Sequence, residues 1–161
     1  MTADWIRALE TDPTFELLGK PPNRERNWVH ADPDRRLDLR YYVDKAGQRL
    51  VGVVTFGSHT EGHPGHGHGG AIASVIDDAM GTTAWTAGLV VVTLSMTVNM
   101  RKVVPLNVAL RLEGWVDRVD GRKVHVACRL VTPPDTVHAD ATGLFLQPAG
   151  GTSSDQIRRD G

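Results

Sequence analysis

Two adjacent aspartates, Asp77 and Asp78, follow a His-Gly-Gly sequence within the stretch HGGAIASVIDDAMGTTAWTAG, residues 68–88. A carboxylate can act as a general base or as a nucleophile. If a helix starts at the glycines, its free backbone N–H groups can hold a phosphate or the oxyanion of an attacked carbonyl. These residue types therefore predict a site for a phosphate or for an attacked carbonyl, unless the glycines only form a flexible loop that starts a helix.

The separation of His68 and Asp77 decides whether one chain can do this chemistry alone. At about 1.5 Å per residue, a helix places them roughly 13 Å apart along its axis. A base and an oxyanion donor must each come within about 3 Å of the same reacting group. If both are catalytic, the site therefore needs two copies of the helix, one from each subunit.

The stretch itself is patterned as the longest helix of the chain. Its apolar residues recur at three- and four-residue spacing and predict one buried stripe: Ile72, Val75, Ile76, Ala79, Thr83 and Ala84. Asp77 and Asp78 project about 100° apart, on opposite flanks of this stripe. Periodicity alone does not choose between them, and solvated charges are the commonest role of such a pair.

Segments with β character precede and follow this helix. Strands are predicted at 37–43, 50–56, 92–100, 108–119, 124–132 and 136–146. Sequential hairpins imply an antiparallel sheet with the long helix on its concave side, which is an α+β fold. In 92–100, Leu94, Met96, Val98 and Met100 alternate with polar residues, so Thr93 is expected on the polar face.

Composition and charge limit the possible partners. The chain has 161 residues, 40% of them hydrophobic, and a net charge of −1. This charge does not favour nucleic acid or a membrane surface as a partner. The single cysteine, Cys128, fits a reducing compartment, and the N-terminus has no apolar run of signal length, so a cytoplasmic location is predicted.

Three segments are predicted along the chain. Residues 1–36 form a short helix and an irregular cover in which Trp28 is the expected packing anchor. Residues 37–148 form the single domain. Residues 149–161 are a polar tail that is expected to be disordered.

Residues 50–147 resemble the hot-dog-fold acyl-CoA thioesterases. The likeness is greatest to the branch that contains the carboxyl-terminal modulator protein, and the phenylacetate-pathway thioesterases are more distant. It rests on these motifs: HGGAIASVID at 68–77, Gly81, Thr93, NMRKVVPL at 99–106 and VDGRK at 119–123. The resemblance implies an antiparallel sheet wrapped around one long central helix and an active site built across a dimer interface.

The resemblance also assigns the reaction and its residues. It implies hydrolysis of an acyl thioester to free acid and coenzyme A, with Asp77 as general base or nucleophile. His68, Gly69 and Gly70 are assigned to the thioester carbonyl, and Thr93 matches a threonine beside the acid. No cofactor is implied, since coenzyme A is part of the substrate.

The residues at the end of the predicted strand 92–100, and just after it, are assigned to the binding of coenzyme A. Asn99, Arg101 and Lys102 match a polar and basic group near its phosphates, as the resemblance implies. Met100 and Val103 depart from the pattern, which has a tyrosine and a proline there. The implied partners are an acyl-CoA or acyl-carrier thioester and a second copy of the chain, in a homodimer that can pair into a tetramer, and the implied role lies in fatty acid metabolism.

Two other functions stay open. A hot-dog hydratase or dehydratase would need a histidine that acts on a Cα or Cβ proton, and the fold can also serve a non-catalytic acyl-CoA- or partner-binding module. A zinc site at His59, His63, His66 and His68 is disfavoured, because the segment has no cysteine and its glycine spacing sets no ligand geometry. We therefore expect no metal.

Overall fold

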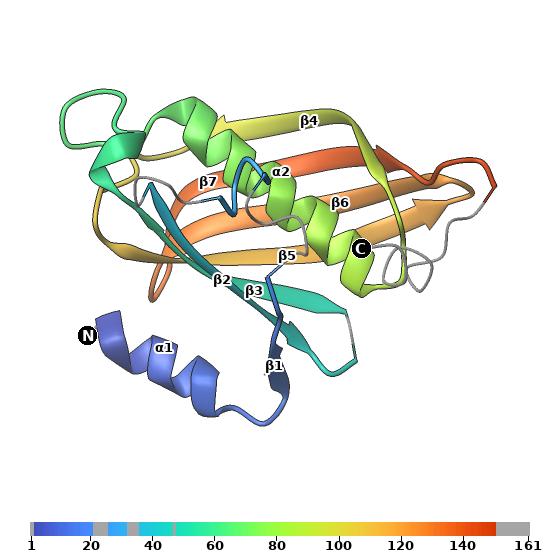
Figure 1. Ribbon diagram of the computed structural model, residues 1–161, viewed down its shortest axis with the longest axis horizontal. Helices are drawn as coiled ribbons and strands as arrows, with labels where there is room; N and C mark the ends of the chain where they lie inside the picture. The colour runs from blue at the N-terminus through green and yellow to red at the C-terminus, as the bar shows by residue number, and fades with distance from the viewer. Residues whose placement is uncertain (1, 21–25, 32–35, 47, 151–161) are drawn as a thin grey trace.

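A seven-stranded antiparallel sheet wraps around helix α2 (Gly69–Thr86) in the computed structural model of the protein (Figure 1), which describes residues 2–20, 26–31, 36–46 and 48–150. The strands are β1 (Phe15–Leu17), β2 (Leu37–Asp44), β3 (Arg49–Phe56), β4 (Val92–Met100), β5 (Ala109–Asp120), β6 (Lys123–Thr132) and β7 (Thr136–Leu146). Their order across the sheet is β1-β2-β3-β5-β6-β7-β4. The predicted α+β architecture is confirmed, and the predicted tail beyond residue 150 lies outside the described residues.

Helix α2 lies across the concave face of the sheet and supplies its inner side to the core (Figure 1). The buried helix residues are the predicted stripe together with Met80: Ile72, Val75, Ile76, Ala79, Met80, Thr83 and Ala84. Full burial of each large side chain contributes about 1.5–3 kcal/mol. Two strand glycines allow close approach, since a Cβ on Gly114 would lie 2.3 Å from Thr83 Oγ1, and one on Gly143 would lie 3.1 Å from Met80 Cε.

Strand β4 departs from simple alternation at a β-bulge. Thr93 pairs with Phe145 and Ser95 pairs with Leu144, so Leu94 is an extra residue. Phe145 is buried in the core, and its cross-strand partner Thr93 therefore faces α2 rather than the outer side. The prediction of Thr93 on the polar face is wrong, as is the core position of Leu94, which is 52% exposed.

The first helix contacts the outer side of β2, the side that faces away from α2. Helix α1 (Thr2–Thr11) brings Glu10 to the hydroxyl of Tyr42 and to Arg40 on β2. Strand β1, which the sequence pattern did not predict, extends the sheet beside β2. The predicted short helix at the N-terminus is confirmed.

The outer face of the sheet carries a buried carboxylate. The Glu113 side chain on β5 is 4% exposed and contacts three guanidinium groups, from Arg49, Arg111 and Arg129. Burial alone would raise the pKa of Glu113, but the hydrogen bond from Arg129 and the three positive charges together lower it below its ordinary value. The buried carboxylate is therefore balanced by three positive charges.

Candidate active site

Asp77 lies in the seam between α2 and β4. The Thr93 hydroxyl donates a hydrogen bond of 2.8 Å to Oδ1 of Asp77. This contact depends on the bulge at Leu94, because without the extra residue the alternation would turn Thr93 away from the helix. Asp77 is half-buried and Thr93 is exposed, so the carboxylate is oriented and still reachable. The contact of hydroxyl and carboxylate is present, and its catalytic role stays a prediction.

The start of α2 has one side-chain-capped backbone donor and two others without a partner among the described residues. His68 caps the helix, and its Nδ1 accepts a hydrogen bond of 2.9 Å from the N–H of Gly70. An accepting Nδ1 places the ring hydrogen on Nε2. Within the described part of the chain, the N–H groups of Gly69 and Ala71 have no partner. The groups available to a substrate oxygen therefore include the N–H of Gly69 and Nε2–H of His68, whereas the N–H of Gly70 is bonded to the His68 ring.

The loop before the helix is held in place by backbone contacts. The N–H of His68 donates to the carbonyl of Thr60 at 2.7 Å, and that of Gly67 donates to the carbonyl of Val104 at 2.9 Å. A Cβ on Gly62 would lie 2.9 Å from the Cα of His68, so this position needs glycine. The loop that carries His68 is therefore fixed by both its own fold and the segment after β4.

The two groups of residues lie at opposite ends of β4. Asp77 contacts Thr93 near the start of the strand, whereas the tip of Met100, at its end, approaches Gly69, since a Cβ there would be 3.8 Å from Met100 Cε. Seven residues of strand span about 23 Å. Within one chain, the carboxylate and the helix start therefore do not meet at one reacting carbonyl.

The residues assigned to the coenzyme are brought together around Asp140 on β7. Arg101 contacts both carboxylate oxygens of Asp140, and Asn99 donates to Oδ1 at 2.8 Å. The hydrogen bonds from Arg101 and then Asn99 lower the pKa of Asp140. Lys102 is exposed and forms no ion pair within the described residues. Sequence reasoning missed Asp140, because only the pairing of β4 with β7 places it beside Asn99.

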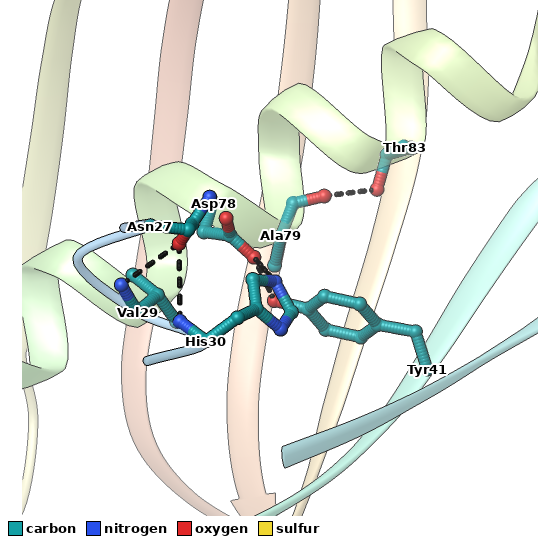
Figure 2. Close-up of polar contacts among 7 residues, drawn as sticks. All are labelled: Asn27, Val29, His30, Tyr41, Asp78, Ala79 and Thr83. Atoms are coloured by element: carbon teal, nitrogen blue, oxygen red, sulfur yellow. Dashed lines mark hydrogen bonds and ion pairs between the residues drawn. The ribbon is translucent and has the colours of Figure 1, made fainter. Parts of the chain in front are cut away.

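Asp78 lies on the flank of the helix that faces Tyr41 of β2 and the segment that carries His30 (Figure 2), about 100° around the helix axis from its neighbour Asp77. Its Oδ2 accepts a hydrogen bond of 2.8 Å from the Tyr41 hydroxyl and lies 3.0 Å from Nε2 of His30. No sequence pattern linked these three residues, which are far apart in the chain. The prediction that Trp28 anchors the N-terminal cover by packing is wrong: it is 70% exposed, and Val29 and His30 are the buried anchors of this segment.

The described residues form neither a cluster of metal ligands nor a helix that could span a membrane. In the described ranges, no three His, Cys, Asp or Glu side chains gather as metal ligands would, and this includes the histidines between 59 and 68. Neither described helix is long and apolar enough to cross a membrane.

The fold and these features define a class of protein. Residues 64–139 match the model of the thioesterase superfamily. The sheet that wraps around α2 has the hot-dog arrangement of that superfamily. The chain belongs to the thioesterase superfamily, which confirms the resemblance seen in the sequence.

Individual relatives make the class more specific. The chain is 32% identical over 150 residues to acyl-coenzyme A thioesterase THEM4 of Xenopus laevis, and the alignment covers 89% of this chain and 68% of that protein. It is 35% identical to the rat protein of the same name over 107 residues, 66% of this chain and 46% of the rat protein. It therefore spans less than half of the rat protein.

Solved structures agree with this class. A thioesterase superfamily protein is 30% identical with a TM-score of 0.64, and the match covers 67% of this chain and 53% of that one. A thioesterase protein of Streptococcus pneumoniae, solved with coenzyme A, has a TM-score of 0.62 at 18% identity, over 70% of this chain and 89% of the other. At this identity, the second likeness supports the fold alone.

Proposed function

We propose that the protein is an acyl-CoA thioesterase that hydrolyses acyl thioesters at sites shared between two subunits. The observation that carries this proposal is the placement of two incomplete sets of residues at opposite ends of β4: Asp77 with Thr93, and His68 with Gly69. Relatives named acyl-coenzyme A thioesterases support this substrate class.

The edge of the sheet supports a dimer. Strand β4 is the last strand of the sheet and exposes apolar side chains, with Val92 and Leu94 52% exposed and Met100 48% exposed. Such an edge favours pairing with another strand. If two β4 strands pair antiparallel about their middle, Thr93 of one copy lies near Met100 of the other. That pairing brings the Asp77 carboxylate to the helix start of the second copy.

The chemistry follows from the groups available in such a dimer. The thioester oxygen would accept hydrogen bonds from the N–H of Gly69 and Nε2–H of His68, at the positive end of the helix dipole. Thr93 occupies Oδ1 of Asp77 and leaves Oδ2 to take a proton from water. The water oxygen then attacks the carbonyl carbon, and the tetrahedral intermediate expels the thiolate of coenzyme A. Direct attack by Asp77, through a mixed anhydride, is the second route.

The cap at the helix start argues against a hydratase or dehydratase. A base for a Cα or Cβ proton needs a free ring nitrogen that faces the substrate. In His68 the accepting nitrogen, Nδ1, is used by the N–H of Gly70, and the remaining nitrogen carries hydrogen. Hydration of crotonyl-CoA by the purified protein would show that this reasoning is wrong.

Lys102 is the residue that we propose for the coenzyme phosphates. Arg101 and Asn99 already share Asp140, so their charge and donors are partly used. Lys102 is exposed beside them.

We also propose a cytoplasmic location, consistent with the single buried thiol of Cys128, whose pKa is raised to about 12 by burial.

An acyl-CoA panel with a thiol reagent for released coenzyme A tests the proposal. Asp77→Asn should lower kcat by at least about 100-fold. Asp117→Asn, an exposed carboxylate on β5, should leave it unchanged. The mass in solution should be that of a dimer or tetramer. Tight binding of acyl-CoA without release, with Asp77 intact, would favour a binding module instead.

A further inference from the structure

A short segment outside the part of the chain matched by the family model docks against helix α2. The described segment 26–31 brings His30 to Asp78, and the ring of His30 meets that of Tyr41 edge to face, with centroids 5.9 Å apart (Figure 2). The His30 side chain is 8% exposed and Tyr41 is 5% exposed. Asp78 is thus held by two buried groups, one from this segment and one from β2.

The backbone of the segment fixes His30 before it meets the helix. Oδ1 of Asn27 accepts hydrogen bonds from the N–H of Val29 at 2.9 Å and of His30 at 3.0 Å (Figure 2). The carbonyl of Asn27 accepts a further bond, from the N–H of Ala31. Val29 is buried in the core and anchors the turn. The imidazole is therefore presented to Asp78 by a locally closed turn.

The same segment contacts α2 one turn closer to its start. The indole N–H of Trp28 donates to Oγ of Ser74 at 3.3 Å, and the Ser74 hydroxyl donates to the carbonyl of Gly70 at 2.8 Å. Gly70 follows Gly69, which carries an available N–H. The segment thus contacts Asp78, the neighbour of Asp77, and also Ser74, which bonds to the residue after Gly69.

We infer that His30 and Tyr41 are positioning residues for the hydrolysis, which hold Asp78 and thereby fix the rotation of α2 that aims Asp77. The inference rests on the proposed thioesterase function. Adjacent helix residues project about 100° apart. When Asp78 is hydrogen-bonded to Tyr41 on β2, the rotation of the helix is fixed and Asp77 points toward β4. For an oxygen roughly 6 Å from the helix axis, a rotation of about 10° moves it by about 1 Å, enough to cost up to about 100-fold in rate.

The chemistry of the cluster suits a fixed contact. Burial, and then the negative charge of Asp78, raise the pKa of Tyr41 well above its ordinary value. The Tyr41 hydroxyl therefore keeps its proton at neutral pH and donates it to the hydrogen bond with Asp78. Its bond to Asp78 is charge-assisted and lies in a largely dry site, where such bonds are strongest.

The test uses tyrosines that are neighbours on β2. Tyr41→Phe removes the hydroxyl that reaches Asp78, and Tyr42→Phe removes one that faces Glu10 on the other side of the sheet. For Tyr41→Phe we expect kcat to fall by about 10- to 100-fold, with KM within about twofold of wild type. Tyr42→Phe should change neither, whatever its effect on the melting temperature.

His30 gives a second and independent comparison. His30→Ala should lower kcat as much as Tyr41→Phe does. His30→Gln should retain most of the wild-type kcat, because the glutamine amide nitrogen can donate a hydrogen bond from near the position of Nε2 of His30. A kcat within twofold of wild type in both Tyr41→Phe and His30→Ala would overturn the inference if Asp77→Asn is inactive. Equal losses in Tyr41→Phe and Tyr42→Phe would overturn it too. Full activity of Asp77→Asn would instead refute the proposed function.

Discussion

Removing the Thr93 hydroxyl isolates the effect of its contact with Asp77. Thr93→Val keeps the size and the β-branched shape of the side chain, so the strand and its bulge should persist. The lost hydrogen bond is 2.8 Å long and ends on a carboxylate. Bonds to charged groups contribute about 1.5–3 kcal/mol, and the exposure of Thr93 places this one at the low end. About 1.5 kcal/mol corresponds to roughly a tenfold loss of kcat.

The assay compares three variants under the same conditions. Release of coenzyme A should fall about tenfold in Thr93→Val, and Thr93→Ser should stay within about threefold of wild type, because its hydroxyl can make the same bond. Thr97→Val is the matched control: it lies on the same strand, is exposed, and pairs with Thr142 on the outer face. An unchanged rate in Thr93→Val, or an equal loss in Thr97→Val, would refute the role of this contact.

Three other changes test the dimer, the coenzyme contact and the outer face. Leu94→Glu should give a monomer by analytical ultracentrifugation that has lost at least about 100-fold in kcat, since a charge would replace an apolar side chain of the pairing edge; an active monomer would contradict the shared site. Lys102→Ala should raise KM about fivefold for acyl-CoA but not for acyl-pantetheine, which lacks the nucleotide phosphates. Glu113→Gln should lower the free energy of unfolding by about 2 kcal/mol at neutral pH, a value reduced by the partial exposure of the arginines. Because the folded-state pKa of Glu113 is lowered, this difference should persist above its unfolded pKa and vanish as the pH falls through the folded one; in urea titrations a constant difference down to pH 3 would refute the charge argument.

The parts of the fold that depend on local sequence pattern could be predicted from the sequence. The apolar stripe of α2 and the strand segments follow from periodicity, and the structure confirms them. The length of the helix also required that His68 and Asp77 act in different subunits if both are catalytic, and their placement at opposite ends of β4 agrees with that requirement. These features need only the rise per residue and the alternation of side chains.

The features that pattern could not predict depend on distant pairing. Alternation alone turned Thr93 away from the helix, and the bulge that reverses this is defined by the register of β4 against β7, about fifty residues later in the chain. Asp140 reaches Arg101 through the same pairing. His30 meets Asp78 only once the segment before the domain folds back on α2, and Tyr41 meets it only once β2 packs against the helix. In each case the missing information was which strand or segment would be the neighbour.

The two glycines at the start of α2 serve different physical purposes. A Cβ on Gly70 would lie 3.1 Å from Nδ1 of His68, so a side chain there would push the ring off the N–H that it caps. A Cβ on Gly69 would meet only the flexible tip of Met100, at 3.8 Å, so nothing in the described chain forbids it. Gly69 is therefore needed only if a ligand comes close to its N–H. Packing against His68 is therefore enough to explain the glycine at 70, whereas the glycine at 69 is explained only by a bound substrate. For this reason we place the thioester carbonyl at Gly69 rather than at Gly70.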